Sequence, residues 1–430
     1  MSATDSTLTN DLTTRAREIT RRELISYAQR TKGSQAATER ARQVMPMGVP
    51  SSFQAYDPHP IVVTRAQGSW MEDVDGHRYT DYDMGFGALF AGHCHPLVRR
   101  AVEDQLENGT LFVTPCETNA EVAEMLGARY GLPMWRFTNS GTEATMDAIR
   151  VARGATGREK IVKVEGGYHG HHDEVMISMK PALDVAGPAD NPTSVPGTAG
   201  ITKAVLGDTI VIPYNDADAL ERVLRTGEVA CFIVEPVMEN IGICKPQAGY
   251  LQAVREITQR YGTLLIFDEV KTGITAGWSG ATGSLGVLPD LVALAKSIGG
   301  GLPLGAFGGK REYMDRSPRA VSCTSARTTA TRCAWPRRRP CWVRSARQRP
   351  PRAASTGTCS CCMPATASSM PPAWKRTPCS SAPKAASRGP RSRSATTATT
   401  RRPTSTSPSR NGSTASTAAS CCRLVSTSSG

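Results

Sequence analysis

Short apolar runs alternate with amphipathic stretches between residues 95 and 310, and this alternation constrains the fold more than any other feature of the chain. The apolar runs have the length and content of strands: WRFTN, KIVKVEG, ACFIVEPV, TLLIFDEV and LVALAKS. The other stretches have helical periodicity: HPLVRRAVEDQLEN, NAEVAEMLGARYG, GTEATMDAIRVAR and GYLQAVREITQRYG. The alternation predicts an α/β fold, in which helices cover both faces of a mostly parallel sheet.

The chain before residue 95 has a different pattern. Residues 1–20 are polar and rich in threonine, so we expect frayed backbone there, whereas residues 21–45 favour a short helix. The stretch IVVTRAQGSWMEDVDGHRYTDYDMG (61–85) reads as short strands with glycine turns, which predicts a β-meander. We therefore expect an N-terminal helix and β-meander (1–90), a large α/β domain (91–315) and a tail (316–430).

Composition changes abruptly near residue 320. Residues 321–430 contain 19 Lys and Arg but no Asp or Glu, whereas residues 1–320 contain 32 basic and 38 acidic residues. The net charge of +13 therefore comes from the tail, and we expect no nucleic-acid partner. The tail also has almost no Val, Ile, Leu or Phe, which predicts disorder. A tail that binds DNA is the alternative, and its affinity would depend strongly on salt.

Cysteine usage and hydropathy bear on location. Nine of the 13 cysteines follow residue 320, and the other four are widely scattered, as in reduced cytosolic proteins. The N-terminus lacks the apolar stretch of a signal peptide, and the apolar runs are too short to span a bilayer. We therefore expect a soluble cytoplasmic protein with no membrane partner.

The segment FTNSGTEATMDAIRVAR (137–153) places a Ser-Gly-Thr turn between a strand and a helix. Free N–H groups and the positive end of the helix dipole make such a junction a site for phosphate. Ser140 and Thr142 would add hydroxyl groups, and Gly141 would allow close approach of the backbone. The alternative is an ordinary helix cap with Glu143 in the first turn.

Two further segments place ionisable side chains after strands. In TLLIFDEV, Asp268 ends an apolar strand, where a buried carboxylate needs a partner such as a protonated ring nitrogen. A strand-end cap or a Mg²⁺ ligand is the alternative, although no GxxxxGK[ST] motif occurs upstream. In LVALAKSIGGGLPLGAFGG, Lys296 precedes three glycines. It is either a surface lysine or, in a dry pocket, a nucleophile for Schiff-base chemistry.

The loop EGGYHGHHD (165–173) supplies aromatic groups. Tyr168 and His169 lie between glycines and could stack on a flat ring, whereas HGHH could instead bind a metal. We expect no metal, because no matching ligand group is evident elsewhere. A phosphate cradle, an acid for a ring nitrogen, a Schiff-base lysine and a stacking aromatic are together what a protein supplies to pyridoxal 5′-phosphate (PLP).

With these residues in view, the chain resembles the class III aminotransferases, which are PLP enzymes of fold type I. The resemblance covers about residues 45–315, and within the family it is strongest to the glutamate-1-semialdehyde aminomutases. Seven segments match in order: GSWMEDVDGHRYTDY, GHCHP, NSGTEATMDAIRVARG, GGYHGHHD, VEPVMEN, LLIFDEVKTG and AKSIGGGLPLGAFGG. The resemblance implies a large domain with a mostly parallel seven-stranded sheet, and a smaller α+β domain that is incomplete here.

The resemblance also implies roles for individual residues. Lys296 would form the Schiff base and shuttle protons, and Asp268 would hold the pyridinium nitrogen. Val270 and Tyr168 would pack on opposite faces of the ring, and Asn240 would lie near the phenolic oxygen. The phosphate would be bound by Ser140, Gly141 and Thr142. Two subunits share each site in such families, so a homodimer is implied.

One departure from the aminomutase pattern concerns the substrate. In GVPSSFQAY (48–56), Gln54 stands where the aminomutase has an arginine that holds the substrate carboxylate. A neutral amide cannot form a charged bidentate pair. We therefore expect an aminotransferase that acts on a small amino donor and a carbonyl acceptor, with an aminomutase as the alternative.

The tail carries the traces of another reading frame. With suitable codons, residues 326–336 read one nucleotide earlier as GTYNGNPLCMA, which resembles the next motif of the family. Residues 394–407 and 417–430 can likewise be recoded as RDYRDYKAADVDI and RGILLPPGLDEQW. We therefore predict a frameshift before residue 326, and an inactive remnant is a further alternative for the chain as it stands.

Overall fold

The computed structural model describes residues 3–112 and 114–316. The predicted frameshift and the disorder of the tail lie outside the described residues. The division of the chain at residues 90 and 315 stays a prediction.

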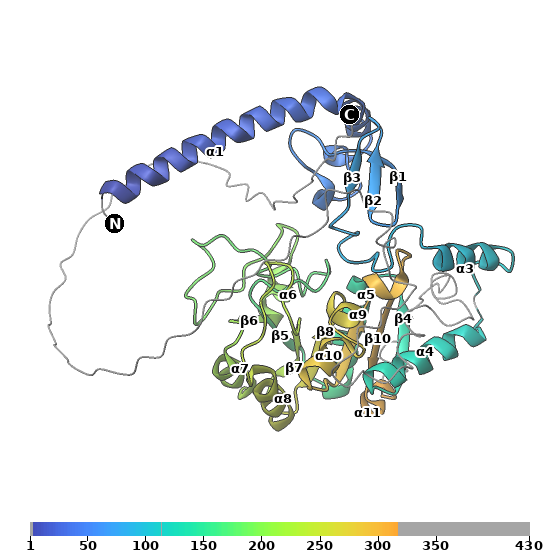
Figure 1. Cartoon of the computed structure of the whole chain (residues 1–430). Helices are drawn as coiled ribbons and strands as arrows, with labels where there is room; N and C mark the ends of the chain where they lie inside the picture. Colours follow the sequence, from blue (N-terminus) through green and yellow to red (C-terminus); the bar gives the residue numbers. More distant parts are fainter. Residues whose placement is uncertain (1–2, 113, 317–430) are drawn as a thin grey trace, which may run out of the picture. The chain divides into compact units, whose positions relative to one another are not determined.

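A seven-stranded sheet organises residues 134–309 (Figure 1). Its neighbours follow the order β4-β10-β9-β8-β7-β5-β6, and β10 is antiparallel to both strands that it pairs with. The other pairs are parallel, so the predicted mostly parallel sheet is confirmed. The strands are β4 (Met134–Thr138), β5 (Lys160–Val164), β6 (Thr209–Ile212), β7 (Val229–Val234), β8 (Leu264–Asp268), β9 (Leu291–Leu294) and β10 (Gly305–Gly309).

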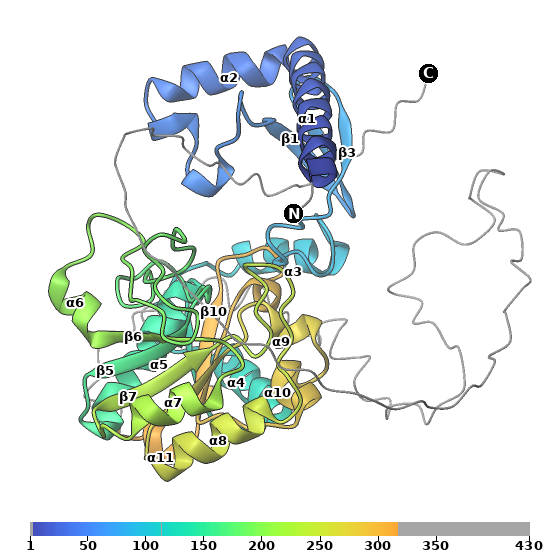
Figure 2. The ribbon, with the colours of Figure 1, turned by 90° about the vertical axis from the view of Figure 1, so that its left-hand side faces the viewer.

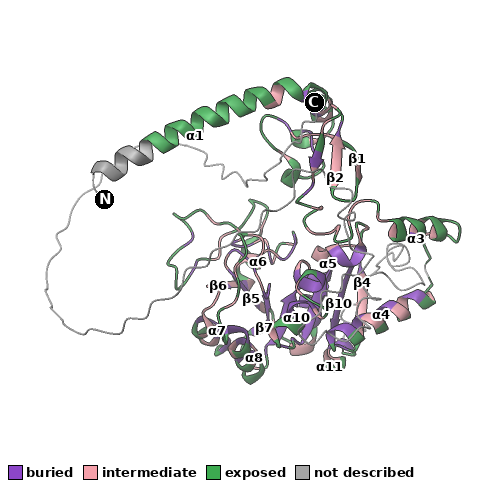
Figure 3. Ribbon diagram, viewed as in Figure 1, coloured by how far each residue is buried: buried purple, intermediate pink, exposed green. Residues whose placement is uncertain are grey.

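Helices cover both faces of this sheet, as the sequence predicts. Alternate strand residues point to opposite faces, so Val162 and Phe232 join one apolar cluster while their neighbours Ile161 and Ile233 join another. The first cluster includes residues of α4 (Glu117–Tyr130), α7 (Ala217–Leu224) and α8 (Tyr250–Arg260). The second includes residues of α5 (Gly141–Thr156) and α11 (Arg311–Met314). Figure 2 shows α7 and α8 side by side, and Figure 3 shows burial concentrated in the central strands and α5.

Two strands of this sheet, β6 and β10, are not among the strands that the sequence predicts.

The remaining helices of this part are short, apart from α3. They are α3 (Pro96–Leu106), α6 (Lys203–Asp208), α9 (Thr272–Thr275), α10 (Gly280–Leu285) and the 3₁₀ helix η3 (Lys296–Gly299).

The N-terminal part consists of helices and a small antiparallel sheet. The expected β-meander forms with the order β1-β2-β3. The expectation of frayed backbone over residues 1–20 is wrong for residues 3–20, which lie in α1; no glycine or proline interrupts the chain there. No helix in the described part of the chain is both long and apolar enough to span a bilayer. The elements are α1 (Ala3–Arg30), α2 (Lys32–Arg42), η1 (Pro46–Gly48), η2 (Ser52–Gln54), β1 (Val63–Gln67), β2 (Trp70–Asp73) and β3 (Arg78–Thr80).

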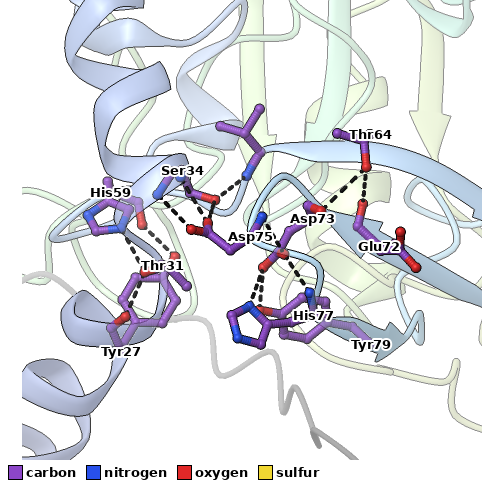
Figure 4. A network of polar contacts seen from close by, with 12 residues as sticks. Tyr27, Thr31, Ser34, His59, Thr64, Glu72, Asp73, Asp75, His77 and Tyr79 are labelled. Atoms are coloured by element: carbon purple, nitrogen blue, oxygen red, sulfur yellow. Dashed lines mark hydrogen bonds and ion pairs between the residues drawn. The ribbon is translucent and has the colours of Figure 1, made fainter.

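A polar network fixes the turn between β2 and β3 (Figure 4). Asp73 Oδ1 accepts hydrogen bonds from the backbone N–H groups of Asp75 and His77, at 3.0 and 2.8 Å. Its other oxygen accepts a hydrogen bond from the buried Tyr79 hydroxyl at 2.7 Å. Asp75 in turn accepts hydrogen bonds from the N–H and the hydroxyl of Ser34, both at 2.9 Å, so the turn is tied to α2.

Tyr79→Phe removes one hydrogen bond of this network and no packing. We expect the free energy of unfolding to fall by about 1.5–3 kcal/mol, because the acceptor is the Asp73 carboxylate and a hydrogen bond to a charged group contributes about that much. Urea denaturation checks the value. Tyr82→Phe is the matched control, since Tyr82 is 78% exposed. An equal effect of the two changes would contradict a stabilising role for the Tyr79 hydroxyl.

Candidate active site

A cavity of about 270 Å³ opens where the large sheet's parallel strands end at their carboxyl termini. The segments that follow β4, β5, β7, β8 and β9 each contribute to its wall. It is lined by Asn139, Ser140, Gly141, Thr142, Tyr168, His169, Gly170, Glu235, Asp268, Val270, Lys271, Ala295, Lys296, Leu302, Pro303 and Leu304. Segments up to 165 residues apart in sequence therefore meet at one edge of the sheet.

The N-terminus of α5 forms one wall of the cavity. Ser140 is the N-cap, and its hydroxyl accepts a hydrogen bond from the backbone N–H of Glu143 at 3.2 Å. Ser140 therefore forms the ordinary helix cap that the sequence offered as the alternative. The same end of the helix also lines the cavity. A Cβ on Gly141 would lie 2.9 Å from a methyl group of Val270, so only glycine lets the helix start approach that side chain. Thr142 Oγ1 lies 3.0 Å from Nδ1 of His171.

Asp268 lies at the end of β8 and is only 4% exposed. Its Oδ2 lies 2.8 Å from Nδ1 of His169, and its Oδ1 accepts a hydrogen bond from the backbone N–H of Val270 at 3.0 Å. Both carboxylate oxygens are therefore oriented by neighbours, as a buried acid requires.

His169 has a different environment from the one expected from the sequence. The ring is buried and contacts Asp268, whereas the sequence indicated a group that stacks beside Tyr168. Its Nε2 has no hydrogen-bond partner in the described part of the chain. The HGHH segment does not gather a metal site among the described residues: His171 contacts Thr142, and His172 pairs with Glu174 at 2.8 Å.

Lys296 follows β9 and is half-buried at the cavity wall. Its φ of 49° lies in the left-handed region, which is costly for a residue other than glycine and is concentrated at functional sites. Burial lowers the pKa of its amine, and the nearby Lys271 cation lowers it further. Asp268, Glu235 and Glu239 oppose this shift. A strained backbone and a more readily neutral amine are the properties of a nucleophilic lysine.

Tyr168 and Val270 line the same cavity. The backbone N–H of Tyr168 donates to Oε1 of Glu235 at 3.0 Å, and its ring meets that of Phe53 edge to face, 6.2 Å between centroids. Burial raises the pKa of the Tyr168 hydroxyl.

Two residues singled out from the sequence do not line this cavity. Asn240 is half-buried in a bend after β7, next to the bridge between Met238 and Cys244. Gln54 ends η2 and is exposed. Their roles beside the cofactor and the substrate stay predictions.

The cavity also contains two ionisable residues that the sequence reading missed. Glu235 follows β7 and is 4% exposed, and burial raises the pKa of its carboxyl group. Lys271 is one of the two cations in the cavity wall. The signal for Glu235 was the same one that identified Asp268, namely an acid directly after an apolar strand.

Comparison with known proteins places this geometry in a family. The model of the family "Aminotransferase class-III" matches residues 52–326. A glutamate-1-semialdehyde 2,1-aminomutase from Methanothrix thermoacetophila is 44% identical over 283 residues, which cover 66% of this chain and 64% of that protein. One from Methanocella arvoryzae is 46% identical over 280 residues, or 64% of each. This chain thus aligns with somewhat less than two thirds of these relatives.

Solved structures agree with the sequence match. An omega-transaminase from Sphaerobacter thermophilus is similar with a TM-score of 0.66 and 36% identity, covering 70% of this chain and 71% of that one. A glutamate-1-semialdehyde aminomutase from Pseudomonas aeruginosa gives a TM-score of 0.67 and 30% identity, covering 74% and 73%. Together with the seven-stranded sheet, these similarities confirm the expected fold class. The chain belongs to the class III aminotransferase family.

Proposed function

We propose that the chain binds PLP in this cavity and moves an amino group from a small amino compound to a carbonyl acceptor. The observation that carries the proposal is the composition of one cavity wall: a lysine with a lowered pKa, a buried carboxylate and a helix N-terminus with hydroxyl groups. Among similar solved structures, one is described as a transaminase with PLP bound, and another as an aminomutase variant in complex with PMP.

The residues present fit PLP at each of its polar ends. The start of α5 offers N–H groups and two hydroxyl groups to a phosphate. A Cβ on Gly170 would lie 2.7 Å from Cα of Thr142, so glycine is what lets this loop pass the helix start. Asp268, oriented by His169, offers a fixed negative charge to a ring nitrogen.

Each residue then has a distinct task. When bound, PLP would supply an electron-withdrawing ring that eases loss of a proton from the substrate carbon. Lys296 would take up that proton and return it, and its lowered pKa favours the neutral amine that this requires. Asp268 would keep the ring nitrogen protonated, because a buried carboxylate stabilises a facing cation. Tyr168 and Val270 would cover the ring and exclude water.

Lys271→Met tests the electrostatic part of this proposal. Removing the Lys271 charge raises the pKa of Lys296, so a higher pH is needed to reach the same fraction of neutral amine. We expect the pH profile of covalent PLP attachment to move to higher pH. The rate of appearance of the PLP absorbance band, measured across pH, checks this. Lys203→Met, an exposed change on α6, should leave the profile in place; an unmoved profile in Lys271→Met would contradict the coupling.

An aminomutase is the second candidate, because the similar curated proteins are named as such. The experiment is to supply glutamate-1-semialdehyde alone, and separately amino donors with a keto acid. Isomerisation without a second substrate would support the aminomutase. Amino transfer that requires a separate acceptor would support the aminotransferase, in keeping with a neutral Gln54.

We also propose that the gene changes frame before residue 326 and that its uninterrupted product is a homodimer. The family match ends at residue 326, and about a third of each aminomutase relative has no counterpart here. Resequencing codons 310–330 in independently isolated DNA tests the proposed frameshift. An unbroken reading frame that encodes the present tail would overturn the proposal. The mass in solution of the present and the repaired chains tests the dimer, and inactivity of the present chain alone would identify it as a remnant.

A further inference from the structure

The loop that carries Tyr168 is hydrogen-bonded to a lysine of β5 that the proposed mechanism does not use. Lys163 lies on β5 between Val211 of β6 and Ile233 of β7, and none of its surface is exposed. Its Nζ donates hydrogen bonds to the carbonyl oxygens of Gly167 at 2.9 Å and Ile177 at 2.6 Å. We infer that Lys163 is a positioning residue that sets the loop for the cofactor; this inference rests on the proposed function.

The two carbonyl groups depend on this lysine. Gly167 and Ile177 are both buried, and neither carbonyl accepts a backbone hydrogen bond from another described residue. The neighbouring backbone hydrogen bonds run from Ser178 N–H to the Val195 carbonyl and from Gly166 N–H to the Ser178 carbonyl. Neither of them involves the carbonyl group of Gly167 or of Ile177. Burying a carbonyl group without a hydrogen-bond donor is costly, so the lysine stabilises both ends of the loop against β5. We call these two hydrogen bonds of Lys163 the clamp.

The clamp reaches the cavity through one peptide unit. Gly167 directly precedes Tyr168, whose N–H donates to Glu235, and His169 follows with its contact to Asp268. The loop is therefore fixed at successive residues by a lysine, a glutamate and an aspartate from β5, the end of β7 and β8. Lys163 itself does not line the cavity, so it acts through the position of Tyr168 and His169.

The clamp does not depend on whether the amine is charged. Burial lowers the pKa of Lys163 to about 7, and the carboxylates of Glu235 and Glu165 oppose that shift. A neutral amine keeps two N–H donors, which is the number that the two carbonyl groups require. The expected role is geometric, and a methionine of similar length would remove it while filling the same space.

The test compares Lys163→Met, Lys163→Gln and Lys160→Met in the full chain. Lys160 lies on the same strand, is part-exposed, and pairs with Glu228 at 2.7 Å, so its loss should change little. Hydrogen exchange reports on the loop without cofactor, and PLP titration with the circular dichroism of the bound PLP band reports on the site. In Lys163→Met we expect PLP to bind at least about 10-fold more weakly, and loop amides to exchange at least about 10-fold faster.

Lys163→Gln should recover part of both losses, since its amide supplies two N–H donors on a side chain one bond shorter. Thermal melts show which variants are folded, and only folded variants are compared. If Lys163→Met does not fold, the comparison uses Lys163→Gln in its place. PLP affinity and dichroism that stay at the unsubstituted values in the folded variants, with only the melting temperature lowered, would overturn the inference. An unsubstituted chain that binds no PLP would count against the proposed function instead, and hydrogen exchange would still decide whether Lys163 holds the loop.

Discussion

Lys296→Ala is expected to abolish covalent attachment of PLP and to lower amino-transfer activity by at least roughly 10²–10⁴-fold, the range typical for loss of a positioned proton carrier. The reason is that Lys296 is the proposed nucleophile of this cavity. The second lysine in the cavity wall, Lys271, lies on the segment after β8. The measurements are the absorbance spectrum with added PLP, and the mass of the chain after borohydride reduction.

The control for this variant is Lys203→Ala, an exposed lysine on α6. It should give the same spectrum and the same reduced mass as the unsubstituted chain. A visible band that borohydride fixes to the protein in Lys296→Ala would move the assignment to another lysine, with Lys271 first. No band in any of the three proteins would show that the present chain does not assemble the site.

Gly305→Ala is expected to lower stability by about 1–3 kcal/mol and to weaken PLP binding, because it forces extra volume into a packed core. Gly305 opens β10 opposite Thr138. A Cβ there would overlap the carbonyl oxygen of Ser140 and the hydroxyl of Thr138. The Ser140 carbonyl belongs to the start of α5, so relief of the overlap moves the proposed phosphate cradle.

Urea denaturation and PLP titration together check this prediction. Gly207→Ala is the control, since a Cβ at that position of α6 meets no atom within 4 Å. Alanine there should stabilise by about 0.4–1 kcal/mol by restricting the unfolded chain. If Gly305→Ala lost stability but kept its PLP affinity, β10 would support the sheet without fixing the cradle.

The elements that the sequence predicted are those whose own side chains carry the pattern. The apolar runs of β5, β7 and β8 and the helical periodicity of α5 and α8 were sufficient. The missed strand β10 has the sequence GAFGG, and its glycines are explained by neighbours from elsewhere in the chain. A Cβ on Gly308 would overlap the ring of Trp135, and one on Gly309 would overlap Leu291. Such a strand forms because of tertiary packing, which local propensity does not encode.

The residues that line the cavity could likewise be predicted only where a single sequence segment carries the pattern. Residues at strand ends were found because a polar group after an apolar run is visible in one segment. The partners that orient them were not, since the pair His169–Asp268 joins residues 99 apart and the pair Tyr168–Glu235 joins residues 67 apart. A buried Lys163 was hidden because KIVKV reads as an ordinary strand with polar positions. Which side chain meets which is fixed only when the strands are ordered in the sheet.

The position of β10 has a consequence for the order in which the molecule can be made. Among the described strands of the large sheet, the ribosome delivers β4 first, yet the one described partner of β4 is β10, which is delivered last of the seven. Until residue 309 has emerged, β4 lacks its partner among the described strands, and the start of α5 that follows β4 is not yet fixed by that pairing. Once that residue has emerged, all seven described strands of the sheet have been synthesised, and the proposed change of reading frame further downstream comes too late to remove one of them.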